Sequence, residues 1–83
     1  MNKKLSPQMI AKYHLKSIYD KKEFYNILEN VLLTPLEFRI MEKMFIDNKT
    51  SYMIATEEDL SESSIKRSQK MALNKIYLYT YNK

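Results

Sequence analysis

The feature that most limits the fold of this chain is the complete absence of glycine. None of the 83 residues is glycine, and the two prolines, Pro7 and Pro35, directly follow a serine and a threonine. Tight hairpin turns and phosphate-binding loops need glycine, because it adopts left-handed backbone conformations at little cost. A proline that follows a serine or threonine is typical of a helix start. We therefore predict an all-α fold, a compact bundle of about five helices.

Polar residues mark the expected helix starts. A side-chain oxygen at such a position can accept a hydrogen bond from an unpaired backbone amide of the first turn. The candidates are Ser6, Asp20, Thr34, Thr50 and Ser61, each followed by apolar residues at helical spacing. Glu37 follows Thr34 at the third helical position and completes a capping-box pattern. The first helix is predicted to run to about Tyr19.

The predicted helices form two parts of a single compact domain. Residues 1–33 are expected to form an N-terminal helical hairpin that builds the core or an oligomer interface. Its second helix carries an apolar stripe that runs from Phe24 to Leu32. Residues 34–83 are expected to contain a C-terminal helix-turn-helix unit, whose second helix covers about residues 62–77.

Alternating tyrosines end the chain. Tyr77, Tyr79 and Tyr81 have the period of a β-strand, but an all-α fold offers no partner strand. We interpret them as a helix end and a tail that packs on the body or on another subunit. Tyrosine is enriched at protein interfaces, so a homodimer formed through the first helix or the tail is one expectation.

Positive charge is concentrated towards the two ends of the chain. Residues 1–30 carry six basic and three acidic side chains, residues 31–60 carry three basic and six acidic, and residues 61–83 carry five basic and one acidic. Such a distribution suits a polyanionic partner, although a charged helix face is more often simply solvated. Lys12 and Lys16 lie one turn apart on the first helix and are expected to be solvated.

Several function classes find no support in the composition. The chain has no cysteine and one histidine, His14, so we expect neither a metal site nor a cofactor, and we do not expect an enzyme. No apolar run approaches the roughly 20 residues of a membrane span. The N-terminal lysines are not followed by a hydrophobic region, so no secretory signal is expected. These observations predict a cytoplasmic protein.

The segment 50–76 is predicted to form a short helix, a turn and a longer helix. The short helix would begin at Thr50 or Ser51, and the turn would fall near residues 58–60. On the longer helix Ile65, Ala72 and Ile76 are spaced by seven and four residues and therefore share one buried face. The opposite face carries polar and mostly cationic side chains: Ser63, Lys66, Arg67 and Lys70.

These signals, in this order, resemble the C-terminal promoter-binding region (region 4) of bacterial sigma factors. The matching residues are Leu33–Glu37, Ile54-Ala55, Leu60-Ser61, Ser64–Arg67, Ala72-Leu73 and Ile76. Among small proteins the pattern is similar to phage-encoded late-gene activators of the RinA and ArpU type. The resemblance covers about half of the chain. It implies a sequence-specific, DNA-binding transcriptional regulator of a phage or mobile element, acting in the bacterial host cell.

The resemblance also implies roles for individual residues. The longer helix would enter the major groove of double-stranded DNA with its N-terminal residues near the base edges. The implied base-reading residues are Ser63, Ser64, Lys66 and Arg67. Lys70, Thr50 and Ser51 would contact phosphates, and Arg67 is the side chain best suited to a guanine edge.

Two departures from the family pattern leave a second function open. Glu58 stands where an apolar residue is usual, and Asp59 stands where glycine is usual. Together with Glu57 and Glu62 they place four acids around the turn, close to the expected path of the phosphates. The alternative is a protein-interaction module that binds RNA polymerase, a sigma factor or another regulator.

Overall fold

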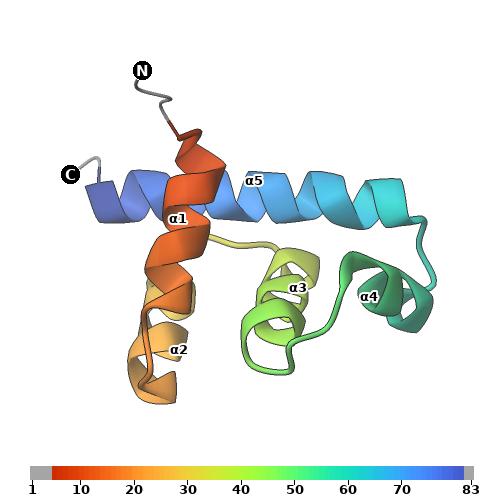
Figure 1. The fold of residues 1–83 in the computed structure, drawn as a ribbon, viewed down its shortest axis with the longest axis horizontal. Helices are drawn as coiled ribbons and strands as arrows, with labels where there is room; N and C mark the ends of the chain where they lie inside the picture. The colour runs from red at the N-terminus through yellow and green to blue at the C-terminus, as the bar shows by residue number, and fades with distance from the viewer. Residues whose placement is uncertain (1–4, 82–83) are drawn as a thin grey trace.

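The computed structural model describes residues 5–81, which form α-helices joined by short connections (Figure 1). Its helices are α1 (Pro7–Lys16), α2 (Lys21–Asn30), α3 (Pro35–Phe45), α4 (Ser51–Glu58) and α5 (Glu62–Tyr81). The predicted all-α fold is therefore confirmed. Within residues 5–81, no helix is both long enough and apolar enough to cross a membrane. Lys3, Lys4 and Lys83, which add to the positive charge of the two ends, lie outside the described residues.

All the predicted capping residues are confirmed. Each accepts a hydrogen bond from a backbone N–H of the first turn that follows it. The donors are the amides of Met9 to Ser6 (3.3 Å), Lys22 to Asp20 (3.0 Å), Glu37 to Thr34 (3.1 Å), Met53 to Thr50 (3.2 Å) and Ser64 to Ser61 (3.1 Å). The capping box of α3 is complete, because the N–H of Thr34 donates in return to the carboxylate of Glu37 (2.9 Å).

The helix α5 is the element on which the others assemble. It has 20 residues, and α1, α3 and α4 all pack against it. Figure 1 shows α5 as one long rod, with α1 crossing its C-terminal half and α4 lying near its start. Its buried face consists of Ile65, Ala72, Leu73 and Ile76. The three predicted core residues of this helix are therefore buried as expected.

The buried side chains of all five helices form one core. Its members are Ala11, Leu15, Phe24, Ile27, Leu28, Val31, Ile40, Met41, Ile54, Ala55, Ile65, Ala72, Leu73 and Ile76. The helix α2 contacts α3 through aromatic rings. The ring centroids of Phe24 and Phe45 lie 6.0 Å apart, and those of the stacked Tyr25 and Phe38 lie 6.3 Å apart. Residues from both predicted parts thus share a single core.

Two helices end earlier than their apolar patterns indicate. The helix α1 ends at Lys16, where the Ser17 hydroxyl donates to the carbonyl of His14 (2.6 Å). Tyr19 therefore lies in the connection to α2 and is 96% exposed. The helix α2 ends at Asn30, and Leu32, which continues its apolar stripe in sequence, is 92% exposed.

The tyrosine-rich tail is helical. The helix α5 runs to Tyr81 instead of ending near Tyr77 as predicted, so the alternation of tyrosines does not form a strand. Tyr77 and Tyr81 lie one turn apart with their ring centroids 5.3 Å apart, and Tyr81 contacts the ring of His14 on α1 edge-on at 5.9 Å. The last turn of α5 therefore contacts α1 on one side, which the alternation of tyrosines in the sequence does not predict.

Replacing Tyr25 by phenylalanine is predicted to remove an alkaline transition of stability. The Tyr25 hydroxyl donates to the carboxylate of Glu42 (2.6 Å), and this hydrogen bond, together with burial and the negative charges nearby, raises the pKa of Tyr25 from 10.0 to about 12. The protonated tyrosine therefore stabilises the fold below pH 10, and this contribution is lost as the pH rises towards 12. Urea titrations at pH 8 and pH 11 measure it. We expect Tyr25→Phe to cost about 1 kcal/mol at pH 8 and to flatten the pH dependence; an unchanged dependence would contradict this assignment.

Candidate functional site

A short turn joins α4 to α5. Asp59 adopts the left-handed conformation (φ 58°, ψ 45°), and its N–H bonds to carbonyls of the last turn of α4. The turn comprises residues 59–61, one position later than predicted, because Glu58 is still helical. On the inner side, Ile54 and Ala55 of α4 are buried in the same core as Ile65 of α5.

The first half of α5 presents a polar and cationic outer face. Ser63, Lys66, Arg67 and Lys70 are exposed, whereas Ile65 on the inner side is completely buried. The ammonium group of Lys66 lies 3.6 Å from the carboxylate of Glu62, a loose pair on the helix surface. The structure thus brings four of the predicted contact residues together on one face.

The remaining three predicted contact residues are hydroxyl side chains engaged within the fold. The Ser64 hydroxyl accepts a hydrogen bond from Ser61 (2.9 Å), and the Thr50 hydroxyl caps α4. The Ser51 hydroxyl lies 3.2 Å from the amide nitrogen of Gln69 and ties the start of α4 to α5. Thr50 and Ser51 therefore sit beside α5, at some distance along the helix from its first turn.

An ion-pair network neutralises two of the four acids around the turn. Arg39 of α3 binds the Glu58 carboxylate with two nitrogens (2.9 and 3.0 Å), and Lys43 binds it at 3.0 Å. Lys43 also pairs with Glu57 (2.8 Å), which in turn pairs with Lys49. The Glu58 side chain is only 11% exposed, and hydrogen bonds from Arg39 and Lys43 lower its pKa to about 2.

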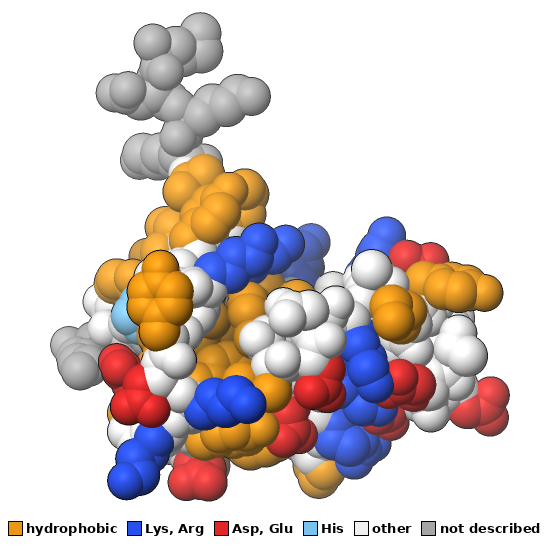
Figure 2. All heavy atoms as spheres, turned by 60° about the horizontal axis from the view of Figure 1, so that its bottom comes forward, with side chains coloured by type: hydrophobic (Ala, Val, Ile, Leu, Met, Phe, Trp, Pro, Cys, Tyr) orange, Lys and Arg blue, Asp and Glu red, His pale blue; other side chains and the backbone are white. Residues whose placement is uncertain are grey.

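The network changes the electrostatic interpretation of the turn. Figure 2 shows Lys and Arg side chains next to Asp and Glu side chains over the region of α3 and α4. The expected repulsion of phosphates by Glu57 and Glu58 is correspondingly weakened, because positive charges from α3 and the following loop lie against both carboxylates. Asp59 and Glu62 remain exposed acids at the start of α5.

The described basic side chains divide into two groups according to whether they pair with a carboxylate. The members that pair with carboxylates are Arg39, Lys43, Lys49, Lys66 and Lys75. Those that make no ion pair with another residue of the range 5–81 are Lys12, Lys16, Lys21, Lys22, Arg67 and Lys70. The unpaired cations belong to α1, α2 and the outer face of α5, and none belongs to α3 or α4.

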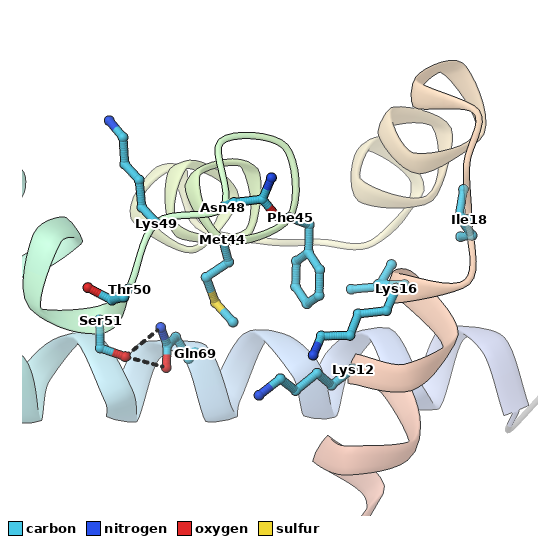
Figure 3. A pocket seen from close by; sticks show the side chains of 11 residues that line it. Lys12, Lys16, Ile18, Met44, Phe45, Asn48, Lys49, Thr50, Ser51 and Gln69 are labelled. Carbon is cyan, nitrogen blue, oxygen red and sulfur yellow. Dashed lines mark hydrogen bonds between the residues drawn. The ribbon is translucent and has the colours of Figure 1, made fainter.

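A surface cleft of about 430 Å³ separates α1 from the start of α4 (Figure 3). It is lined by Lys12, Leu15, Lys16, Ile18, Met44, Phe45, Asn48, Lys49, Thr50, Ser51 and Gln69. The ammonium groups of Lys12 and Lys16 reach into the cleft from α1, whereas Lys49 points away from it. The Ser51–Gln69 contact closes the opposite side. The cleft is therefore a cationic hollow that also contains amide and hydroxyl groups.

Lys12 and Lys16 could not be assigned to this cleft from the sequence alone. Their spacing places both on one side of α1, but it does not show that this side faces α4. The missing information is tertiary, since it depends on the angle at which α1 crosses α5.

No protein-family model matches this chain, and neither a curated protein nor a solved structure is significantly similar to it. The resemblance to sigma-factor region 4 and to the phage activators therefore stays a prediction based on the residues quoted above. Among residues 5–81, no group of three or more histidine, cysteine and acidic side chains is placed to hold a metal ion.

Removal of the Glu58 charge is predicted to flatten the acid limb of the stability curve. The carboxyl has a pKa of about 2 in the folded protein and 4.5 without the network, so its stabilisation is complete above pH 4.5 and is lost as the pH falls towards 2. Glu58→Gln should cost about 1 kcal/mol at pH 7 and less at pH 3. Urea denaturation at both pH values measures the difference, with Glu23→Gln, an exposed acid on α2, as control. Equal losses at the two pH values would contradict the role of the network.

The left-handed conformation of Asp59 predicts opposite effects for two small substitutions. A side chain with a β-carbon in this conformation costs about 1 kcal/mol relative to glycine. Asp59→Gly should therefore be at least as stable as the wild type, and Asp59→Ala should be less stable than Asp59→Gly by about 1 kcal/mol. Thermal unfolding of the two variants measures the difference. Lys66→Gly and Lys66→Ala, in the helical part of α5, are the control pair. If the glycine variant were the more stable of this pair too, the effect at Asp59 would be unrelated to the turn.

Proposed function

We propose that this protein is a sequence-specific DNA-binding transcriptional regulator that uses α4, the turn and α5 as a helix-turn-helix. In this proposal, the outer face of α5 lies in the major groove. Arg67 reads a base edge, Ser63 and Lys66 lie near neighbouring bases, and Lys70 contacts a phosphate. The activity is binding and positioning on DNA, with recruitment of RNA polymerase as a second step.

The observation that carries the proposal is the pair of unneutralised cations on the outer face of α5. Arg67 and Lys70 make no ion pair within the described range, although five other described cations do. Their helix is held on its inner side by α1, α3 and α4. A rigid helix with available arginine and lysine side chains suits groove binding, because arginine can donate two hydrogen bonds to one guanine.

The dimensions of a helix and of the groove support the same arrangement. An α-helix with its side chains is about 10–12 Å wide, and the major groove of B-DNA is about 12 Å wide. A helix seated in the groove consequently has a sugar–phosphate strand along each side. The start of α4, with the capped Thr50 and the adjacent Ser51, lies beside α5 through the contact to Gln69. Backbone amides at a helix start are suitable phosphate ligands.

The ion pairs of Glu57 and Glu58 support DNA binding indirectly. Acids that face phosphates would oppose association, and these two are held against Arg39, Lys43 and Lys49 instead. The exposed Asp59 and Glu62 remain at the N-terminal end of α5. We infer that the turn itself stays at the edge of the groove and that the residues from Ser63 onward enter it.

A second candidate function is supported by apolar side chains around the turn. Tyr52 (69% exposed), Met53 (45%) and Leu60 (42%) are directed to solvent on α4 and in the turn. Exposed aromatic and methionine side chains are typical of protein-binding surfaces. This observation favours a module that binds RNA polymerase, a sigma factor or another regulator, either together with DNA binding or in place of it.

A double substitution of Lys66 and Arg67 by alanine is predicted to abolish specific DNA binding. Loss of one bidentate arginine–guanine contact costs about 1–3 kcal/mol, which corresponds to a loss of affinity of roughly 5- to 150-fold. The measurement is a binding titration against fragments of the protein's own genomic locus, with Lys21→Ala/Lys22→Ala as the matched control. The control removes two unpaired cations from α2 and should retain specificity.

Two outcomes would contradict the proposal. Wild-type protein that binds all fragments equally and weakly would exclude sequence-specific recognition. Equal losses in the α5 variant and in the α2 control would assign binding to net charge alone. Co-purification with RNA polymerase that depends on Tyr52 and Met53, and is unaffected by Lys66→Ala/Arg67→Ala, would favour the second candidate function.

A further inference from the structure

We propose that α1 provides a separate contact to the DNA backbone: the cleft that contains Lys12 and Lys16 binds a phosphodiester of the strand beside the groove occupied by α5. This inference rests on the proposed DNA-binding function and extends it. The helix α1 lies outside the segment that resembles sigma factors, so the contact is a feature of this chain and not of the resemblance.

The chemistry of the cleft suits a phosphate. Lys12 and Lys16 direct two ammonium groups into it (Figure 3), and neither makes an ion pair with a residue of the described range. Asn48 and Gln69 add amide groups to its lining. Lys49, which also borders the cleft, is turned away and paired with Glu57. Two unpaired ammonium groups in one hollow make a region of positive potential that favours an anion.

The positions of the two lysines are fixed by the core. Ala11 and Leu15 form the buried face of α1 and are 1% and 2% exposed. Lys12 and Lys16 each follow one of these residues directly, so both lie on the same flank of the helix. Since α1 packs against α5, this flank faces the start of α4 across the cleft (Figure 3). The core therefore fixes the side of α1 from which both lysine side chains project.

The cleft lies where a DNA strand would pass. Gln69 of α5 lines it and is hydrogen-bonded to Ser51, at the start of α4, which the proposed function places next to a phosphate. A helix that fills the major groove has a sugar–phosphate strand on each flank, because the widths of helix and groove are nearly equal, about 12 Å. On the flank of Gln69 that strand would reach Ser51 and then the two lysines of α1. The contact is to phosphate, so it adds affinity and orientation but no sequence preference.

The test compares salt dependence in matched variants. Wild type, Lys12→Gln/Lys16→Gln and the control Lys21→Gln/Lys22→Gln are titrated with a specific fragment and an unrelated fragment at several salt concentrations. Each neutralised phosphate contributes about 0.9 to the slope of log affinity against log salt. We expect the slope of the cleft variant to be smaller in magnitude by about 0.9, the contribution of one phosphate, with affinity reduced about tenfold on both fragments at 0.1 M salt. The control lysines do not line the cleft and should leave the slope nearly unchanged.

The outcomes separate this inference from the proposed function. If wild type binds specifically and the cleft variant keeps its slope, or changes it no more than the control does, the α1 contact is excluded while α5 recognition stands. If wild type shows no salt-dependent binding to duplex DNA, both proposals fall. A larger loss on the specific fragment than on the unrelated one would assign the lysines to base recognition and would contradict a phosphate contact. The midpoint temperatures of thermal unfolding should be the same for all three proteins, because the substituted groups are solvent-accessible.

Discussion

Burial of one face of α5 is the constraint on which the rest of the structure depends. Ile65, Ala72 and Ile76 are completely buried, and α1, α3 and α4 all pack against this helix. Because side chains on a helix have fixed directions relative to one another, burying this face also fixes which residues are outside. A rotation of α5 by one residue would expose Ile65 and bury Lys66. Core packing therefore determines the direction of Arg67 and Lys70 as strictly as it determines the fold.

Polar interactions hold α3 in place against this helix and against α4. Glu37 is 3% exposed, and its carboxylate accepts hydrogen bonds from the Thr34 amide and from Lys75 of α5 (2.8 Å). Glu58 occupies a position expected to be apolar, and it is accommodated because Arg39 and Lys43 satisfy its oxygens. Either carboxylate would be costly at such a site without its partners. The same ion pairs that secure α3 and α4 also remove negative charge from the region around the turn.

Local features of the sequence predicted more of the fold than of the site. Helix starts depend on a few adjacent residues, so Ser6 and Thr34 identify them directly. Helix ends depend on what the last turn contacts: Tyr19 is almost fully exposed, whereas the half-exposed Tyr81 contacts the ring of His14, although the two tyrosines give similar apolar signals in the sequence. The pairing of Glu58 with Arg39 and the convergence of Lys12 on the cleft depend on contacts between helices. A single sequence contains no measure of such contacts, and these parts of the candidate site could therefore not be predicted from it.

The distribution of ion pairs shows where positive charge is available on the surface of residues 5–81, which the net charge of +4 for the whole chain does not show. Arg39 and Lys43 of α3 and Lys49 of the following loop are paired with carboxylates, and Lys75 is paired with Glu37. Charges held in this way contribute little to the field at a distance, because each is accompanied by an opposite charge. The unpaired cations of α1 and of the outer face of α5 therefore stand out, because α1 carries no acidic residue, whereas Lys21 and Lys22 of α2 lie beside Asp20 and Glu23. The unpaired cations of α1 line the cleft, and those of α5 lie on its outer face. An extended polyanion can therefore bind both groups at once, whereas a small anion can bind only one of them.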